Sequence, residues 1–376
     1  MAASIDYPIC TICGIRLHES SALEKPLSTH GPSPWYPDMW RTSAIAISGP
    51  RWPSYAKAPV ADGAVTRYVA DPSWYPGGVS IKPDGPTVFT QTEYASGDND
   101  NINPTAEDHW YFGIHSACED IANVAMRKSR EARIRTTADL WMTLDQRCTK
   151  TDSELRFFTP FLPNIPENRP GEPLNLSLRR YYLPHDAMVG DDDDFGGLYE
   201  WWEDDPLFIP ELTARIVSNL EKCKPTDDAC LQSRNQFENL PQEIKDPILA
   251  ELLNQPLPLG CNYSIPQSYW KQAFLEIPFL WDLDKGILDE KTREAESTGT
   301  EWDWEMITRQ LMTPVTMVDD TIQFKPITWN YDQVGLAVPH GLNNRRRIWQ
   351  ILEEMYPDDL GMETEFENPA EESDDE

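Results

Sequence analysis

The sequence predicts an α+β protein with an irregular, loop-rich N-terminal unit, a helical middle segment and a mixed C-terminal region. Short β-favouring segments alternate with Pro-Gly turns in the first hundred or so residues, whereas apolar residues recur at helical spacing further along the chain. Fourteen tryptophans accompany 33 prolines. This composition is typical of a fold held by buried aromatic side chains rather than of a repeat or a coiled coil.

The chain divides into five regions. Residues 1–150 combine short strands with a helix, and residues 151–236 form a Pro-rich, acidic connection that contains one helix. Residues 237–284 are expected to be helical, and residues 285–360 to be mixed in structure. Residues 361–376 are expected to be disordered, because seven of the last twelve residues are acidic and such a tail buries little apolar surface.

The strands of the N-terminal unit are expected where β-branched residues lie between turn-forming Pro and Gly. They are Thr66–Val69, Val79–Ile81 and Thr87–Thr90. A helix is expected over His115–Arg133, because Ile121, Val124 and Ala125 mark an apolar face.

The later elements follow from the same periodicity. The connection holds a helix over Glu211–Leu220, whose apolar face is formed by Leu212, Ile216, Val217 and Leu220. The C-terminal region is expected to contain an exposed charged stretch, two helices and a short strand. The charged stretch is Asp289–Glu296, the helices are Trp302–Leu311 and Asn344–Met355, and the strand is Thr321–Phe324.

The net charge bears on the class of partner. A charge of −31 repels the phosphates of nucleic acids and of membrane surfaces, so neither is an expected partner. The run Arg345-Arg346-Arg347 is the one basic exception. It is interpreted as a solvated helix face, or as pairing with Glu353 and Glu354.

The cellular compartment is predicted from segments that the sequence lacks. No run of about 18 apolar residues occurs, so no membrane span is expected. The start lacks the basic and apolar parts of a secretory signal. Seven cysteines are an odd and sparse set, and a disulfide between Cys223 and Cys230 is not expected. We therefore expect a cytoplasmic or nuclear protein.

Two short motifs predict a metal site. Cys10 and Cys13 are separated by two residues in Cys-Thr-Ile-Cys-Gly, a spacing at which two thiolates can hold one ion from a tight turn. His115 and Cys118 are three positions apart at the start of the expected helix, and therefore on one face. Together the four side chains would complete a Cys₃His tetrahedron for zinc.

Alternatives to this ligand set stay open from the sequence. His18, His30 and His109 are competing ligands. In a metal-free arrangement, Cys118 would be a buried core thiol and His115 a hydrogen-bonded histidine. The other cysteines show no ligand spacing: Cys148, Cys223, Cys230 and Cys261.

The segment 237–253 predicts an amphipathic helix that begins with Leu-Pro. Its apolar stripe consists of Leu240, Ile244, Ile248, Leu249, Leu252 and Leu253. The opposite side carries Gln242, Glu243, Lys245, Asp246 and Glu251. Pro241 suits the first helical turn, and Asn239 with Gln242 would form a capping box. Pro247 lies inside the helix, where a proline removes a hydrogen bond.

The pattern Leu-Pro-x-Glu-Ile-x-x-x-Ile-x-x-x-Leu-Leu resembles the first helix of an F-box. Downstream, Ser-Tyr-Trp-Lys-Gln-Ala-Phe from Ser268, Phe-Leu-Trp-Asp from Phe279 and Gly-Leu-Asn-Asn-Arg-Arg-Arg-Ile-Trp from Gly341 resemble segments of a group of large fungal F-box proteins. That group carries a similar Cys-x-x-Cys-Gly and a later His-x-x-Cys. Pro247 departs from its pattern.

The resemblance implies a non-catalytic substrate receptor of a cullin–RING ubiquitin ligase. Its docking helix would bind the Skp-type adaptor through Leu240, Pro241, Ile244, Ile248 and Leu252, and the rest would present an unknown protein substrate. The sequence holds no P-loop, G-x-S-x-G or HExxH motif. The alternative is a zinc-stabilised interaction scaffold that no longer binds the adaptor, and the same apolar residues could also face the chain's own core.

Overall fold

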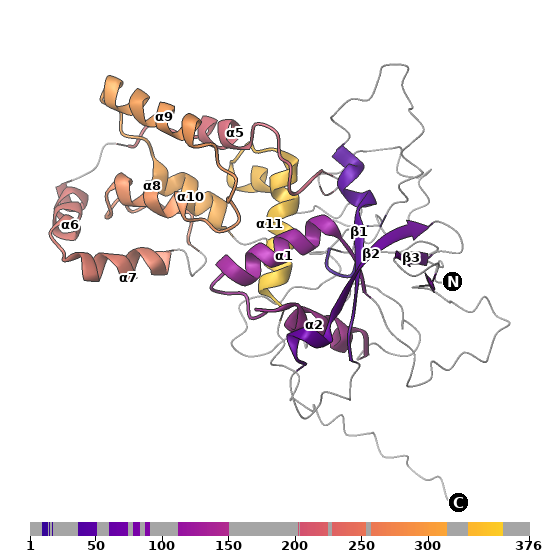
Figure 1. The fold of residues 1–376 in the computed structure, drawn as a ribbon. Coiled ribbons are helices and arrows are strands. Elements are labelled where there is room, and N and C mark those ends of the chain that lie inside the picture. Colours follow the sequence, from indigo (N-terminus) through magenta and orange to yellow (C-terminus); the bar gives the residue numbers. More distant parts are fainter. Residues whose placement is uncertain are drawn as a thin grey trace, which may run out of the picture.

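The computed structural model describes residues 10–13, 15, 17, 37–50, 60–73, 78–82, 87–90, 112–149, 202, 204–224, 228–252, 257–313 and 330–355. In Figure 1 a β-sheet lies on one side of the molecule and most of the helices on the other, with α1 and α11 between them. This arrangement confirms the predicted α+β class. The expected strand Thr321–Phe324, the acidic tail and most of the connection 151–206 lie outside the described residues.

The sheet has five antiparallel strands in the order β4-β3-β2-β1-β5. In chain order the strands are β1 (Ala44–Ser48), β2 (Thr66–Ser73), β3 (Gly78–Lys82), β4 (Thr87–Thr90) and β5 (Phe112–His115). The sequence predicted β2, β3 and β4 but missed β1 and β5. Both missed strands are buried along their whole length, so neither shows the alternation of apolar and polar residues by which strands are recognised.

Two helices follow the sheet in the chain. Helix α1 (Ser116–Lys128) begins directly after β5 and packs against α11, and its residues Ile121 and Ala125 are fully buried. It ends at Lys128, five residues earlier than predicted, and the hydroxyl of the next residue, Ser129, donates to Glu353 at 2.8 Å. The helix α2 (Thr137–Thr149), which the sequence did not predict, packs against the short turn before β2.

Among the described residues, the helical part contains six further helices before α11. They are α5 (Leu212–Ser218), α6 (Asp228–Glu238), α7 (Gln242–Leu252), α8 (Gln267–Leu275), α9 (Lys285–Thr298) and α10 (Trp304–Met312). Helices α8 and α10 pack closely against each other, and Trp270, Phe274 and Leu311 are fully buried between them. The expected charged stretch Asp289–Glu296 lies within α9, which Asp284 caps through the backbone N–H groups of Gly286 and Ile287.

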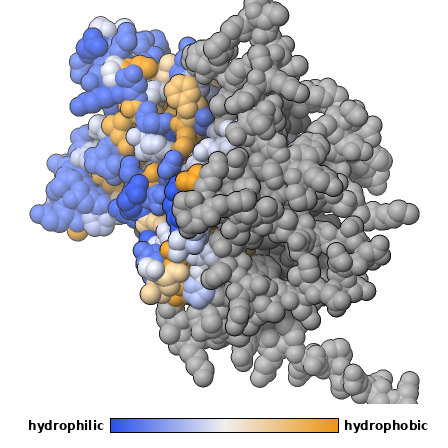
Figure 2. Space-filling model, turned by 45° about the vertical axis from the view of Figure 1, so that its right-hand side comes forward, coloured by the Kyte–Doolittle hydropathy of each residue, from blue (hydrophilic) through white to orange (hydrophobic). Residues whose placement is uncertain are grey.

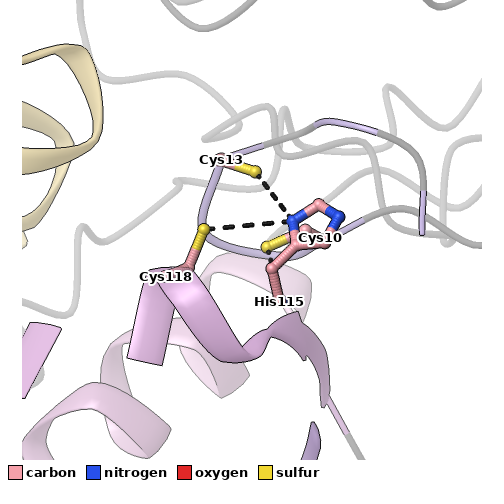
Figure 3. A group of neighbouring side chains, drawn as sticks. All are labelled: Cys10, Cys13, His115 and Cys118. Carbon is pink, nitrogen blue, oxygen red and sulfur yellow. Dashed lines mark hydrogen bonds between the residues drawn. The ribbon is translucent and has the colours of Figure 1, made fainter. Parts of the chain in front are cut away.

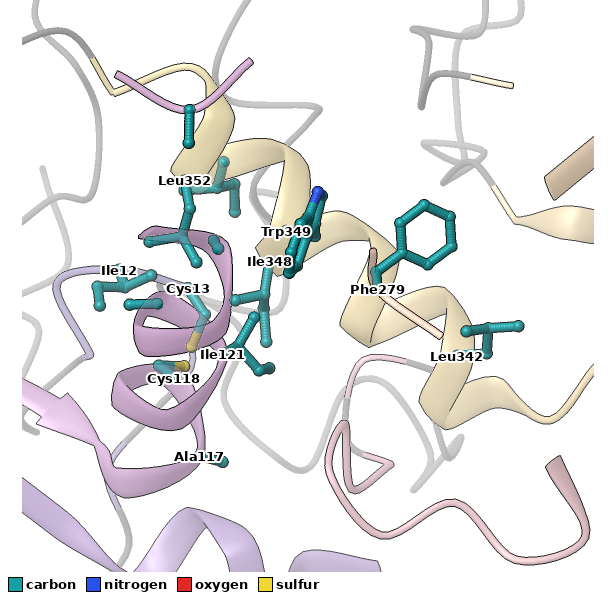
Figure 4. Packing of buried hydrophobic residues seen from close by; sticks show 14 of the residues in the cluster. Ile12, Cys13, Ala117, Cys118, Ile121, Phe279, Leu342, Ile348, Trp349 and Leu352 are labelled. Carbon is teal, nitrogen blue, oxygen red and sulfur yellow. The ribbon is translucent and has the colours of Figure 1, made fainter. Parts of the chain in front are cut away.

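Helix α11 (His340–Glu353) is buried from Gly341 to Leu352. Figure 4 shows its apolar side chains between those of α1 and Phe279. The solvated face predicted for its arginine run is wrong. Arg345 is 0% exposed, pairs with Asp282 at 2.6 and 2.8 Å, and donates to the carbonyl oxygens of Pro206 and Leu207. The predicted pairing holds for Arg346, which lies 4.0 Å from Glu353.

The close approach of α11 to residue 205 gives a first prediction. A methyl group at Gly341 would collide with the carbonyl oxygen of Asp205 and lie 3.1 Å from the side chain of Ile209. Because backbone atoms cannot give way cheaply, Gly341→Ala should lower the free energy of unfolding by about 1–3 kcal/mol. Urea denaturation measures the change.

Gly260→Ala is the matched control, because a methyl group at that position would meet nothing within 4 Å. Equal stability of the two variants would contradict the packing described for α11.

Candidate functional site

The first half of the candidate metal centre is a tight turn from Cys10 to Cys13. The backbone N–H of Cys10 donates to the carbonyl oxygen of Ile15 at 2.9 Å, which closes the turn. Thr11 then fixes the turn to the sheet, because its N–H donates to the carbonyl oxygen of Gly113 in β5 at 3.0 Å. Because Gly113 lies two residues before His115 in β5, this hydrogen bond holds the turn close to His115.

The second half is the corner between β5 and α1. His115 is the last residue of β5, and Cys118 lies in the first turn of α1. Their spacing of three residues directs both side chains toward the Cys10–Cys13 turn, as Figure 3 shows. The strand-to-helix corner therefore joins two motifs that are about a hundred residues apart in the sequence.

The four predicted ligand side chains form one buried cluster. Their ligand atoms all lie within 4.8 Å of one another, and each of the four residues is buried. Nδ1 of His115 is 3.3 Å from Sγ of Cys13 and 3.9 Å from Sγ of Cys118. Tetrahedral ligands on a metal ion of zinc's size lie roughly 3.5–3.8 Å apart. The cluster can therefore hold a metal ion. The competing ligands His18, His30 and His109 lie outside the described residues.

The electrostatics of the three thiols are uneven. Burial pushes the pKa of Cys10 upward, yet hydrogen bonds from Cys118 and Cys13, and the nearby His115, hold it well below its ordinary value. Burial raises the pKa values of Cys13 and Cys118 well above that value, and their hydrogen bonds to Cys10 raise them further. A bound cation would favour the thiolate form of all three cysteines.

Groups that the sequence did not predict surround the ligands. The ring of Trp40 lies 4.6 Å from the ring of His115, between centroids. The guanidinium of Arg347 donates from Nη1 to the carbonyl oxygen of Cys13 at 2.9 Å. No motif in the sequence indicates Trp40. Arg347 was noticed only as part of a basic run, because helical spacing does not reveal which distant carbonyl oxygen a side chain meets.

Three further cysteines are not members of the cluster. No disulfide joins Cys223, Cys230 or Cys261 to another of the described cysteines. The thiol of Cys230 donates to the carbonyl oxygen of Asn262 at 3.2 Å instead of joining Cys223 in a disulfide.

The second candidate site is helix α7, and its faces differ from the prediction. Lys245 was assigned to the polar side, yet it is only 8% exposed and donates to the carbonyl oxygen of Glu238 at 2.8 Å. Its Nζ lies 5.5 Å from the centroid of the Tyr269 ring of α8. Lys245 and Leu249, which is 6% exposed, are the buried residues of α7. The aliphatic part of the Lys245 side chain thus occupies the buried position that the helical periodicity predicted for Ile244.

The predicted docking residues therefore lie largely outside the chain's own core. Ile244 is 50% exposed. Leu240, Ile248 and Leu252 are half-buried, and Pro241 is exposed. Leu252 packs against the core cluster. Leu253 lies outside the described residues.

The start of α7 also differs from the expected capping box. The side-chain amide of Asn239 donates back to the carbonyl oxygen of Asn235, and that of Gln242 donates to Asp246. Neither side chain reaches the backbone of the other, as a capping box requires. Helix α7 continues through Pro247 to Leu252.

The segments that carry the distal part of the resemblance form core rather than surface. Trp270, Phe274, Phe279 and Leu280 are buried. The segment at residues 279–282 meets the segment at residues 341–349, where Asp282 pairs with Arg345.

Comparisons of the chain with protein-family models, curated proteins and solved structures give no match. Within the described residues, no helix has the length and apolar character needed to cross a membrane. A proposal for function therefore depends on the two candidate sites themselves.

The two faces of α7 give a second prediction. Ile244→Ala should change the free energy of unfolding by about 0.5 kcal/mol or less, because the side chain is half in water. Leu249→Ala should cost about 2 kcal/mol or more, because the side chain is buried and its loss leaves a cavity. Urea denaturation of both variants measures the difference. An equal loss in the two variants would mean that the outer face of α7 is packed.

Proposed function

We propose that this chain is a non-catalytic, F-box-like substrate receptor of a cullin–RING ubiquitin ligase, with an N-terminal unit stabilised by zinc. Helix α7 binds the Skp-type adaptor, and other parts of the chain hold a protein substrate. The observation that carries the proposal is the division of α7, whose inner face packs on α8 while Leu240, Ile244 and Ile248 are left partly in water.

An adaptor-binding helix needs an apolar face that its own chain does not use. A helix that served only the core would bury Ile244 and Ile248 and place Lys245 in solvent. The opposite arrangement in α7 favours docking over core packing. Figure 2 shows apolar residues among the hydrophilic surface of the helical part. Leu231 of α6 and Leu275 of α8 are further exposed leucines in this part.

The helices beneath α7 suit such a role because they are firmly built. Helix α8 contributes Trp270 and Phe274 to a dry core against α10. Glu305 of α10 is fully buried and pairs with Arg309 at 2.8 Å. It also accepts the N–H groups of Asn262 and Tyr263, which ties the loop before α8 to α10. A docking helix on this base can bind a partner with little ordering cost.

The third prediction tests adaptor binding. Leu240→Asp combined with Ile244→Asp should abolish co-purification with the Skp-type adaptor, because two carboxylates would have to be buried in an apolar groove. Pull-down with purified adaptor at micromolar concentration, together with circular dichroism, measures binding and folding.

Leu259→Asp is the control, since Leu259 is a comparably exposed leucine outside α7, and this variant should bind normally. A wild-type chain that does not bind the adaptor would refute the proposal. Global unfolding of the double variant would show instead that α7 is a core helix.

Zinc is the ion that suits the cluster. Three thiolates and one imidazole form a tetrahedral sulfur–nitrogen set of the kind that structural zinc sites use. Complete burial of the four ligands leaves no open position for water or substrate, so the ion would stabilise the fold rather than catalyse a reaction. Binding such an ion would contribute directly to the folding of residues 10–13 and 112–128.

The fourth prediction concerns zinc content. Protein purified without chelator should carry about one zinc per molecule by elemental analysis. Cys13→Ser and Cys118→Ser should each lose the metal, and the double variant should be no worse, because both break the same site.

Cys261→Ser, which alters a free thiol elsewhere, should keep the metal. Absence of stoichiometric metal from the wild type would establish the cluster as packed thiols around a core histidine.

The second candidate function is a zinc-stabilised interaction scaffold that does not bind the adaptor. One feature of α7 favours it, because Pro247 inside the helix departs from the F-box pattern. Stoichiometric zinc in a wild-type chain that does not bind the adaptor would select this function.

A further inference from the structure

We propose that Arg347 is a positioning and charge-balancing residue of the metal centre. Its guanidinium, supplied by α11, fixes the Cys10–Cys13 turn and offsets the net negative charge of the loaded site. The inference rests on the proposed zinc centre and adds to it a required residue 334 positions after Cys13.

Arg347 reaches the site from a different part of the chain than the ligands. It is 2% exposed, and its Nη1 donates to the carbonyl oxygen of Cys13 at 2.9 Å. In Figure 4, Cys13 and Cys118 lie beside Ile348 and Leu352 of α11, with Ile121 of α1 among them. The guanidinium of Arg347 therefore lies at the border between the metal cluster and helix α11.

A second contact holds the guanidinium in place. Nη2 of Arg347 lies 3.3 Å from Oδ1 of Asn344, one turn earlier in α11. The amide nitrogen of Asn344 in turn donates to the carbonyl oxygens of Trp202 and Asp204, both at 2.9 Å. These contacts fix the amide orientation and direct its oxygen toward Arg347. The guanidinium is thus held in place by contacts within the protein.

The charge of the loaded centre explains why a cation is needed there. Three thiolates carry three negative charges, a neutral imidazole carries none, and a divalent ion carries two positive charges. The sum is one negative charge in a fully buried volume, and an isolated buried charge is strongly unfavourable. Arg347 supplies the opposite charge.

The same contact couples metal binding to the packing of α11. If Arg347 favours the loaded site, then the loaded site favours the position of Arg347 by the same free energy. Loss of zinc should therefore loosen α11 as well as the Cys10–Cys13 turn.

The experiment compares three replacements of Arg347 in the full-length chain. Zinc affinity is measured by competition with a chromophoric chelator, and the ligand set by the absorption spectrum of the cobalt(II) form. Arg347→Met and Arg347→Gln should each weaken zinc binding about 10- to 100-fold, as loss of an outer-shell partner does. Arg347→Lys, which retains the charge, should recover most of the affinity. The thiolate-to-cobalt absorption should persist in all variants.

Arg346→Met is the matched control, because Arg346 is the adjacent buried arginine of α11 and lies over the Phe279 ring rather than at the cluster. It should lower stability yet leave zinc affinity within about twofold of the wild type. Hydrogen exchange on the wild type provides a measurement that needs no variant. Removal of zinc should accelerate exchange in α11.

Three results would overturn the inference while leaving the zinc centre intact. They are wild-type affinity in Arg347→Met or Arg347→Gln, equal weakening in Arg347→Lys, and equal weakening in Arg346→Met. Unchanged exchange in α11 on zinc removal would also overturn it, even if no neutral variant folds. A wild type that binds no zinc would refute the metal centre itself, and the inference with it.

Discussion

The burial of the arginines of α11 is the constraint on which the described structure depends. A guanidinium taken out of water is stable only where carbonyl oxygens and carboxylates replace its hydration. For Arg345 these come from Pro206, Leu207 and Asp282, and for Arg347 from Cys13. Helix α11 can therefore take its place only when three segments that are far apart in the sequence have assembled around it. Apolar packing would tolerate small shifts of these segments, but charge-assisted hydrogen bonds fix their register.

This constraint also brings the two candidate sites into one structural frame. One flank of α11 packs on α1, whose first turn carries Cys118. Another meets Phe279 and Trp281, whose rings lie 6.1 and 6.2 Å from that of Trp349. These residues follow α8 within a few positions, and α7 packs on α8. A metal ion in the cluster would therefore stabilise the base of the helical part as well as the N-terminal unit. In a receptor, such a rigid connection would hold a substrate at a defined distance from the adaptor.

The sequence predicted features that are determined locally and missed those that depend on distant segments. The fold class, three strands and the metal ligands followed from turn residues, from periodicity and from the spacing in Cys-x-x-Cys and His-x-x-Cys. Strand β1 was missed because Ile45 and Ile47 lie in a strand buried on both faces, between β2 and β5. The predicted exposure of Arg345 was wrong because no local pattern shows that the carbonyl oxygens of residues 206 and 207 surround its guanidinium. Trp40 could not be found at all, since no local pattern indicates its contact with the distant His115.

Helix α7 shows how a wrong prediction of face bears on function. Because Lys245 rather than Ile244 lies on the inner side, α7 is oriented so that Glu243 and Pro247 are both exposed to solvent. Because Pro247 has no N–H, the carbonyl oxygen of Glu243, four residues earlier, loses its helical partner. That oxygen lies on the exposed side, where water can replace the lost bond, so the proline costs the fold less than it would in a buried helix. What Pro247 alters is the outer surface next to Ile244 and Ile248. Its effect therefore falls on how a partner fits α7, and adaptor binding rather than stability separates the two proposed functions.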